Sequence, residues 1–193
     1  MQNSDKIILD LCGGTGSWSE PYHATGYDRR IITLPDNDVR LFKFPKEKIY
    51  GVLAAPPCDY FSKAKHFHGK GNYTHDFKEG LSIADACVRI AYFTGAVFWA
   101  LENPYGYLPD WYGPPPFIFD PWQFGDQWQK RTCLWGEFNH PVPSVKEKPD
   151  GLVKFSMLKS KDIFPEYYGK LSRKERRAIT PPNFARAFFE ANQ

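Results

Sequence analysis

The stretch Ala54-Ala55-Pro56-Pro57-Cys58-Asp59-Tyr60-Phe61-Ser62 ends an apolar run with two prolines and then presents a single cysteine. Two other short apolar runs also end in glycine-rich or polar sequence, at Ile7-Ile8-Leu9-Asp10-Leu11-Cys12-Gly13-Gly14-Thr15-Gly16 and at Trp99-Ala100-Leu101-Glu102-Asn103-Pro104. Runs of this length are typical of buried parallel strands. Because the carboxyl ends of parallel strands meet at one edge of a sheet, the three stretches predict a single site.

The elements around these stretches predict the fold class. Strands are expected near residues 7–11, 30–34, 50–55 and 96–101, and apolar residues spaced by three and four predict a helix over 76–94. Alternating strands and helices are typical of an α/β protein. The sequence therefore predicts a Rossmann-like α/β fold, a mostly parallel sheet with helices on both faces.

The length of the chain suits one domain, because 193 residues with 42% hydrophobic content can bury a sizeable core. We expect a single domain over 1–193, with a cofactor and catalytic core over 1–105. An irregular aromatic and proline-rich segment should follow over 106–170, with one strand at 131–135. Helices are expected over 171–193, since Ser172 and Glu175 form a capping pattern and Pro181-Pro182 is typical of a helix start.

Composition excludes several protein classes. The net charge of +3 permits a polyanionic partner but is too small for a protein that coats DNA. The four cysteines form no Cys-x-x-Cys pair, so free thiols are expected rather than disulfides or zinc. His66 and His68 lack an evident third ligand, and no metal site is expected. The chain shows neither a signal pattern nor a membrane-length apolar run, so we expect a soluble, cytoplasmic protein that is not secreted and has no membrane partner.

Cys58 and Glu102 are the candidate chemical groups. A thiol held outward by prolines can act as a nucleophile if its surroundings favour the anion. An acid at the end of an apolar strand is rare unless it is capped, paired or functional. Cys58 could also be a small buried hydrophobic residue, which is the common fate of a cysteine.

The glycines after Asp10 indicate a nucleotide-like cofactor, because residues without a β-carbon allow a ligand to approach the backbone. The spacing is not Gly-x-Gly-x-x-Gly, and no Gly-Lys-Ser/Thr follows. Nicotinamide and P-loop phosphate sites are therefore disfavoured. A bare tight turn remains the structural alternative.

In their order along the chain, Asp-x-x-Gly-Gly-x-Gly, Pro-Pro-Cys-x-x-Phe-Ser and Glu-Asn-Pro resemble the motifs of the DNA methyltransferases that form 5-methylcytosine. In that family the first motif binds S-adenosylmethionine, the Pro-Cys motif supplies the nucleophile and a Glu-Asn-Val motif supplies the acid. Here proline replaces valine at Pro104, and residues 10–16 match more loosely than residues 56–62. The resemblance covers residues 1–105 and describes a compact member without a full target-recognition domain.

The resemblance implies a methyltransferase fold and methyl transfer from S-adenosylmethionine to C5 of cytosine in DNA. The Cys58 thiolate would add to C6 of the base, which makes C5 nucleophilic, while Glu102 assists at N3 with a pKa raised by burial. A cytosine in a duplex would first swing out of the stack.

The resemblance also assigns contacts. Asp38 is expected at the adenine amine, although it could instead cap a turn, and Asp36 or Asp28 at the ribose hydroxyls. The expected cofactor-binding residues are Asp10, Cys12, Gly13, Gly14, Gly16, Trp18, Asp36, Asp38 and Pro56. The expected substrate-binding residues are Pro57, Phe61, Ser62, Asn103 and Pro104.

The chain departs from the family at several points. It has no room for the usual target-recognition region, and Gln129-Lys130-Arg131-Thr132 is the nearest equivalent of the family's Gln-x-Arg-x-Arg motif, which makes Arg131 the third candidate catalytic residue. Asp59 replaces the usual glutamine. The basic cluster over 170–177 could contact phosphates or be a solvated helix face, and the aromatic segment over 105–128 could stack on bases or be packed loop. A targeting protein could also supply recognition.

Three other functions stay open beside cytosine-5 methylation of DNA. C5 alkylation of a free or modified pyrimidine nucleotide fits the missing recognition region. A catalytically inactive module that binds nucleic acid or a partner protein would keep the pocket but not the chemistry. An amino-methyltransferase is disfavoured, because such enzymes carry Pro-Pro-Tyr or Pro-Pro-Phe where this chain has Pro56-Pro57-Cys58.

Overall fold

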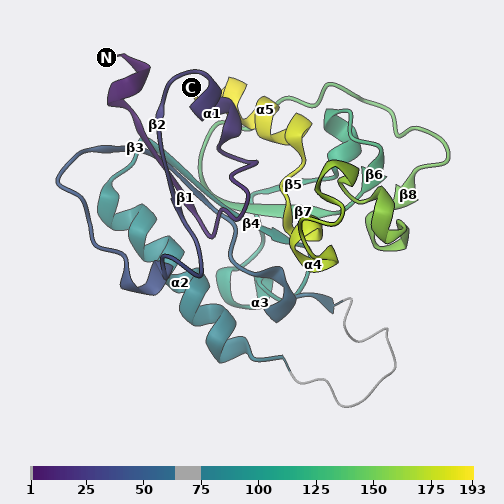
Figure 1. The fold of residues 1–193 in the computed structure, drawn as a ribbon, viewed down its shortest axis with the longest axis horizontal. Coiled ribbons are helices and arrows are strands. Elements are labelled where there is room, and N and C mark those ends of the chain that lie inside the picture. Colours follow the sequence, from purple (N-terminus) through teal and green to yellow (C-terminus); the bar gives the residue numbers. More distant parts are fainter. Residues whose placement is uncertain (1, 64–74) are drawn as a thin grey trace.

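The structure, a computed structural model, describes residues 2–63 and 75–193 (Figure 1). Its helices are α1 (Glu20–Ala24), α2 (Phe77–Thr94), α3 (Pro109–Tyr112), α4 (Arg173–Ala178) and α5 (Pro182–Ala191). Its strands are β1 (Ile7–Leu11), β2 (Asp28–Ile32), β3 (Ile49–Ala54), β4 (Phe98–Pro104), β5 (Phe117–Phe119), β6 (Trp128–Gln129), β7 (Thr132–Glu137) and β8 (Val153–Lys154).

Within the described residues, six strands form one sheet in the order β2-β1-β3-β4-β7-β5. The first four are parallel neighbours, and β7 runs antiparallel to both β4 and β5. The chain passes from β1 outward to β2 and then returns to β3 on the other side of β1. The carboxyl ends of β1 and β3 therefore border the crevice in which open α/β sheets bind ligands.

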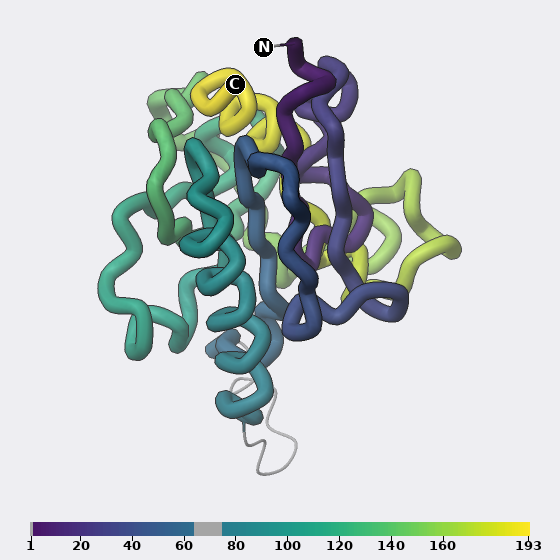
Figure 2. Tube along the Cα trace, turned by 90° about the vertical axis from the view of Figure 1, so that its left-hand side faces the viewer, coloured from purple at the N-terminus to yellow at the C-terminus, as the bar shows by residue number. Residues whose placement is uncertain are grey.

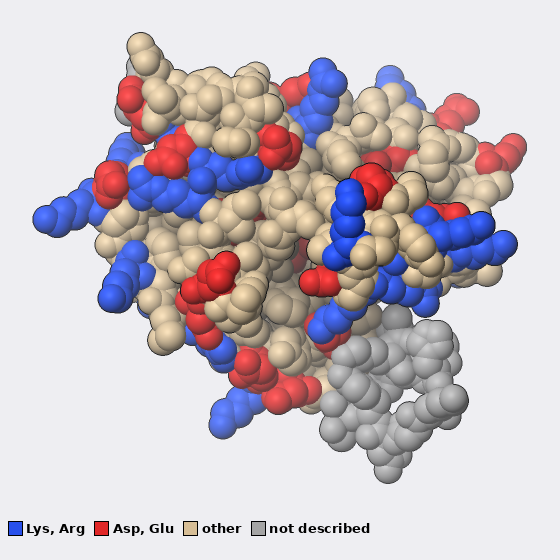
Figure 3. Space-filling model, in the orientation of Figure 1, with Lys and Arg blue, Asp and Glu red and all other residues tan. Residues whose placement is uncertain are grey.

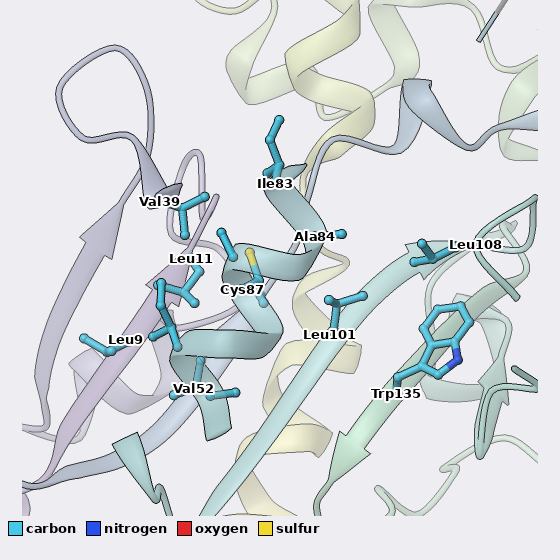
Figure 4. Packing of buried hydrophobic residues seen from close by; sticks show 14 of the residues in the cluster. Leu9, Leu11, Val39, Val52, Ile83, Ala84, Cys87, Leu101, Leu108 and Trp135 are labelled. Carbon is cyan, nitrogen blue, oxygen red and sulfur yellow. The ribbon is translucent and has the colours of Figure 1, made fainter. Parts of the chain in front are cut away.

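Helices cover both faces of this sheet. On one face, α2 packs Ile83, Ala84 and Cys87 against buried residues of the strands (Figure 4). On the other face, Trp18 and Tyr22 pack with Phe184 and Phe188 of α5. Figure 2 shows α2 in front of the strands and α5 beyond them. The predicted fold class, a mostly parallel sheet with helices on both faces, is confirmed.

The element boundaries follow from local signals in the sequence. The strand predicted at 7–11 is β1, and α2 begins after Asp76, whose carboxylate accepts a hydrogen bond from the Glu79 backbone N–H at 3.0 Å. Gly95, with φ of 56°, ends that helix in the left-handed conformation. Ser172 and Glu175 cap α4 reciprocally, as predicted.

The segment after residue 105 is more ordered than predicted. The strand expected at 131–135 is β7, but β5 and β6 also lie within the stretch expected to be irregular. β5 has three residues and pairs with β7, so its extended form depends on a partner distant in sequence. One sheet thus contains strands from both sides of residue 105, and the division of the chain at this point stays a prediction.

Residues 153–180 pack around a small apolar cluster of their own, made of Phe155, Ile163, Phe164 and Ile179. Arg176 of α4 is buried, with 2% of its surface exposed, and its guanidinium holds this segment together. It donates to the carbonyls of Ile163 at 2.7 Å and Leu171 at 3.3 Å, and to both the carbonyl and the hydroxyl of Ser160.

Replacing Arg176 with methionine is expected to lower the free energy of unfolding by about 3 kcal/mol or more, because buried carbonyls would lose their donor. Equilibrium denaturation should show the loss, and limited proteolysis should cut first within 153–180. Arg186→Met is the matched control, because Arg186 is 77% exposed and pairs only along its own helix with Glu190. Equal losses in the two variants would contradict a structural role for the Arg176 guanidinium.

Asp126 predicts a pH-dependent stability. Burial raises the pKa of this carboxyl to about 7, while a hydrogen bond from Asn183 opposes the shift. The unfolded chain releases the same proton near pH 4, so the folded state holds an extra proton between these values. The contribution to stability is therefore complete below about pH 4 and is lost as pH rises through about 7.

Asp126→Asn should remove this dependence, because the amide oxygen can still accept from Asn183 and carries no charge. At pH 8 the variant is expected to be more stable than the parent chain by up to about 4 kcal/mol, and at pH 5 the difference should shrink. Thermal unfolding at both pH values measures this, with exposed Asp150→Asn as the control. A difference independent of pH would overturn the assignment.

Two sequence expectations concern a metal site and a membrane-spanning helix. His66 and His68 lie outside the described residues. Within 2–63 and 75–193, no three His, Cys, Asp or Glu side chains gather as a metal ion would need. In the same ranges, no helix is both long enough and apolar enough to cross a membrane.

Candidate active site

A cavity of about 1450 Å³ opens at the carboxyl ends of the parallel strands. Cys12 after β1, Ala55 and Cys58 after β3, and Pro104 at the end of β4 all line it. Residues of α4 form part of the opposite wall. In the space-filling view, Lys and Arg side chains gather over α4 and the loops beside it, next to a hollow near the middle of this face (Figure 3).

Cys58 lies in the cavity wall, partly buried, at the start of a single turn of 3-10 helix (Cys58–Tyr60). Pro57 precedes that turn in extended conformation and so points the chain out of β3. Burial raises the pKa of the thiol, Lys130 and Arg177 lower it, and Glu102 and Asp59 raise it. The thiol is therefore largely neutral at pH 7, and any attack by its sulfur needs a base or nearby positive charge.

Glu102 lies on β4, the parallel neighbour of β3, as predicted. Burial raises the pKa of its carboxyl, and Lys130 opposes the shift. The two groups are close enough for the Glu102 charge to act on the Cys58 thiol. Among the described residues the cavity wall includes Pro104 but not Glu102, which is partly exposed two residues earlier on β4.

Asn103 ties these two strand ends together. It is 1% exposed, and its amide nitrogen donates to the Pro56 carbonyl at 3.0 Å. This bond joins the end of β4 to the Pro-Pro-Cys loop. The structure thus gives Asn103 and Pro56, expected at the substrate and the cofactor, a role in holding Cys58 and Glu102 side by side.

The glycine loop after β1 is tightly wound. Cys12, Gly14 and Gly16 have φ values of 57°, 54° and 73°, in the left-handed region. A β-carbon at Gly13 would lie 2.4 Å from the Asp10 carboxyl carbon, so only glycine fits there. Of this loop, Cys12 lies in the cavity wall.

Asp10 supports the glycine loop from within. It is fully buried, and burial raises the pKa of its carboxyl to about 6. One oxygen accepts from the Ser19 hydroxyl at 2.5 Å, and the other has no hydrogen-bond partner among the described atoms. A buried acceptor without a donor is costly. Asp10 is not among the described residues of the cavity wall, and its contact with a cofactor stays a prediction.

The acids expected at the cofactor differ in position. Asp38 lines the cavity and holds Arg40 through both carboxylate oxygens, at 2.6 and 2.9 Å, which lowers its pKa. Asp36 is exposed and is not among the described residues of the wall, whereas its neighbour Asn37 is. Asn37 was missed because an amide two residues after a proline carries no particular signal.

Two aromatic residues expected at the site lie in the core instead. Trp18 is 2% exposed and packs edge-on against Phe188, with ring centroids 5.3 Å apart. Phe61 is 0% exposed and stacks on Phe77. Both follow a loop closely and fill the space beneath it. Neither is among the described residues of the cavity wall, and the cofactor role of Trp18 and the substrate role of Phe61 stay predictions. Pro57, Ser62 and Pro104 do line the cavity.

Basic residues that follow residue 129 line part of the cavity wall together with Cys58. Residues of the predicted basic cluster over 170–177 have different positions. Arg176 is buried and hydrogen-bonded to backbone carbonyls, whereas Arg173, Lys174 and Arg177 line the cavity. Lys174 pairs with Asp59 at 2.8 Å, which joins α4 to the Pro-Pro-Cys loop. The basic residues of this wall are Lys130, Arg131, Lys154, Arg173, Lys174 and Arg177.

Lys130 was missed by the sequence analysis, which gave the catalytic role in this segment to Arg131. The charge of Lys130 acts on both Cys58 and Glu102. Arg131 also lines the cavity, but its guanidinium lies over the Tyr105 ring, 5.0 Å from the centroid. The motif Gln-x-Arg was a usable signal for this segment, and the catalytic role of Arg131 stays a prediction.

Comparison with known proteins places this geometry in context. The protein named "Probable DNA (cytosine-5)-methyltransferase" of Frog virus 3 (isolate Goorha) is 28% identical over 160 residues, which cover 72% of this chain and 73% of the relative. No family model matches the chain. The resemblance predicted from the three motifs is confirmed by this relative.

The fold also has solved counterparts. A structure described as a DNA modification methyltransferase encoded within an E. coli prophage superposes with a TM-score of 0.55 at 13% identity over 74% of this chain. This chain spans 52% of that solved chain, about half its length. Spodoptera frugiperda DNMT2 gives a TM-score of 0.39 at 14% identity, over 82% of this chain and 59% of the solved one. The Rossmann-like fold predicted here is thus confirmed as one found in a methyltransferase.

Proposed function

We propose that this chain is an enzyme that transfers a methyl group from S-adenosylmethionine to C5 of cytosine in DNA. The observation that carries the proposal is the pairing of Cys58 and Glu102 at the carboxyl ends of neighbouring parallel strands, beside one large cavity and joined by the Asn103 bond to Pro56. The name of the Frog virus 3 relative supports the same reaction.

Cys58 is the nucleophile in this proposal. Its sulfur forms a bond to C6 of the pyrimidine, and the electron pair of the C5–C6 double bond becomes available at C5. C5 would take the methyl group, whose bond to the donor sulfur breaks. A base such as solvent water would then remove the C5 proton as the C6–sulfur bond breaks, which restores the aromatic ring and releases Cys58 as the thiolate. Lys130 and Arg177 favour the thiolate that begins this sequence.

Glu102 supplies the proton that the ring needs at N3. Negative charge develops there as sulfur adds at C6, and a protonated carboxyl can share its hydrogen with N3. Burial raises the pKa of Glu102 and so increases the protonated fraction near neutral pH. The Lys130 ammonium lies close enough to Cys58 and Glu102 to stabilise negative charge on either group.

The residues present fit the methyl donor. The left-handed loop of Cys12 and Gly14 brings backbone close to the cavity, and Asp10 holds an unpartnered oxygen beneath it. Asn37 and Asp38 offer polar groups at the far end of the same cavity. When bound, S-adenosylmethionine supplies an electrophilic methyl group on sulfur.

The test is the product. The protein is incubated with methyl-labelled S-adenosylmethionine and, in separate reactions, duplex DNA, single-stranded DNA or deoxycytidine monophosphate, and nucleosides are analysed by mass spectrometry. The proposal expects labelled 5-methylcytosine from DNA. Label in the mononucleotide alone would favour the rival C5 alkylation of free nucleotides, and no label in any reaction would favour an inactive binding module.

A further inference from the structure

Tyr105 is an aromatic side chain that is partly exposed to solvent in the wall of the cavity. It follows Pro104 directly at the end of β4, lines the cavity and is 48% exposed. Its backbone N–H donates to the Arg131 carbonyl at 3.0 Å, which fixes the residue to the neighbouring strand segment. The other described aromatic residue of the cavity wall, Phe155, is buried in its own cluster.

Two cations flank the Tyr105 ring. The Arg131 guanidinium lies 5.0 Å from its centroid, and the Lys63 ammonium lies 5.8 Å from it. Lys63 is shared with Tyr107, at 5.0 Å. A fixed, half-exposed ring with cations close to it is an arrangement that binds nucleic acid strands, since a base can stack on the ring and phosphates can meet the charges.

The neighbouring wall extends the same pattern. Arg173 and Arg177 of α4 and Lys154 of β8 line the cavity together with Arg131. Arg40 also lines the cavity, but it is paired with Asp38 and Glu79. Arg131, Arg173, Arg177 and Lys154 therefore add positive charge to the wall that these pairs do not neutralise.

We propose that Tyr105 stacks on the nucleobase next to the target cytosine, and that Arg131 contacts the phosphate joining the two nucleotides. The proposal rests on the proposed function, because it takes the base beside Cys58 as the target. It makes Tyr105 a substrate-binding residue that distinguishes a strand from a single nucleotide. The stacking contact would hold the neighbouring base whatever its identity, because every base has a face that can stack.

The test uses a short single-stranded oligonucleotide in which the fluorescent base 2-aminopurine lies next to a central cytosine. Stacking on Tyr105 should quench this fluorescence on binding. Tyr105→Ala should abolish the quenching and weaken binding about 5- to 150-fold, the range expected for one stacked base, while Tyr105→Trp should retain both. Tyr92→Ala is the matched control, because Tyr92 is also exposed, at 65%, but belongs to the last turn of α2.

Arg131→Met should weaken oligonucleotide binding and lower the slope of log Kd against log salt concentration by about 0.7, the value for one phosphate contact on a single strand. With methyl transfer as readout, Tyr105→Ala should raise KM for the oligonucleotide and leave KM for deoxycytidine monophosphate unchanged.

Quenching that survives Tyr105→Ala would overturn the proposal. An equal rise in KM for the oligonucleotide and for deoxycytidine monophosphate would also overturn it. The binding measurements do not need catalysis. If the chain transfers no methyl group, they still decide whether Tyr105 stacks on a base, so the two proposals fail separately.

Discussion

Replacing Cys58 with alanine is expected to reduce formation of 5-methylcytosine below detection while the protein still binds DNA. C5 of cytosine is too weak a nucleophile to attack a sulfonium methyl group unaided, and the sulfur bond at C6 is what activates it. Alanine offers no atom that can form this bond, so the loss should be far larger than the factor of about 10²–10⁴ typical of removing a general acid or base. Mass spectrometry of the treated DNA measures it.

The covalent step can be trapped directly. With 5-fluorocytosine in the DNA, fluorine replaces the C5 hydrogen and cannot leave as a cation, so the enzyme should stay bonded through Cys58 after methyl transfer. The parent protein should form a DNA adduct that survives denaturation, and Cys58→Ala should form none. Cys133→Ala is the control, because this cysteine is fully buried in β7 and outside the cavity wall, and it should still form the adduct. An adduct with Cys58→Ala would disprove the assignment.

The sequence predicted the parts of the site that belong to strand ends. Apolar runs identify parallel strands, and the residues at the carboxyl end of each strand must lie at one edge of the sheet. Cys58 and Glu102 were predicted in this way, and β3 and β4 are indeed neighbours. The core of the fold was predictable for the same reason, since β1 and α2 carry their own patterns and end signals.

The buried positions of Trp18 and Phe61 were not predicted, because a motif specifies spacing and not the direction of a side chain. Each lies a few residues beyond a functional loop, and packing beneath the loop decides its position. The basic wall was only partly predictable, since Lys130, Lys154 and Arg177 come from separate segments. The position of α4 depends on the buried hydrogen bonds of Arg176. The sequence could not show which basic residue of Arg173-Lys174-Glu175-Arg176-Arg177 is the buried one.

Glu102→Gln is expected to lower kcat by about 10²–10⁴-fold with little change in DNA affinity. The amide has nearly the same shape and can hydrogen-bond to the base, but it cannot release a proton to N3. Glu137→Gln at the opposite end of β7 is the control and should keep full activity, because Glu137 is exposed and lies across from Trp99 at the start of β4.

The pH profile separates a chemical role of Glu102 from a structural one. Burial raises the pKa of both Cys58 and Glu102. The protonated Glu102 carboxyl and the Cys58 thiolate are the active forms, so the rate should fall as pH rises through the pKa of Glu102 and should rise with pH toward that of Cys58. Glu102→Gln removes only the first dependence. Its remaining activity should therefore increase with pH up to the thiol pKa, more steeply than in the parent enzyme. A variant that loses activity by the same factor at every pH would show that Glu102 only positions the site.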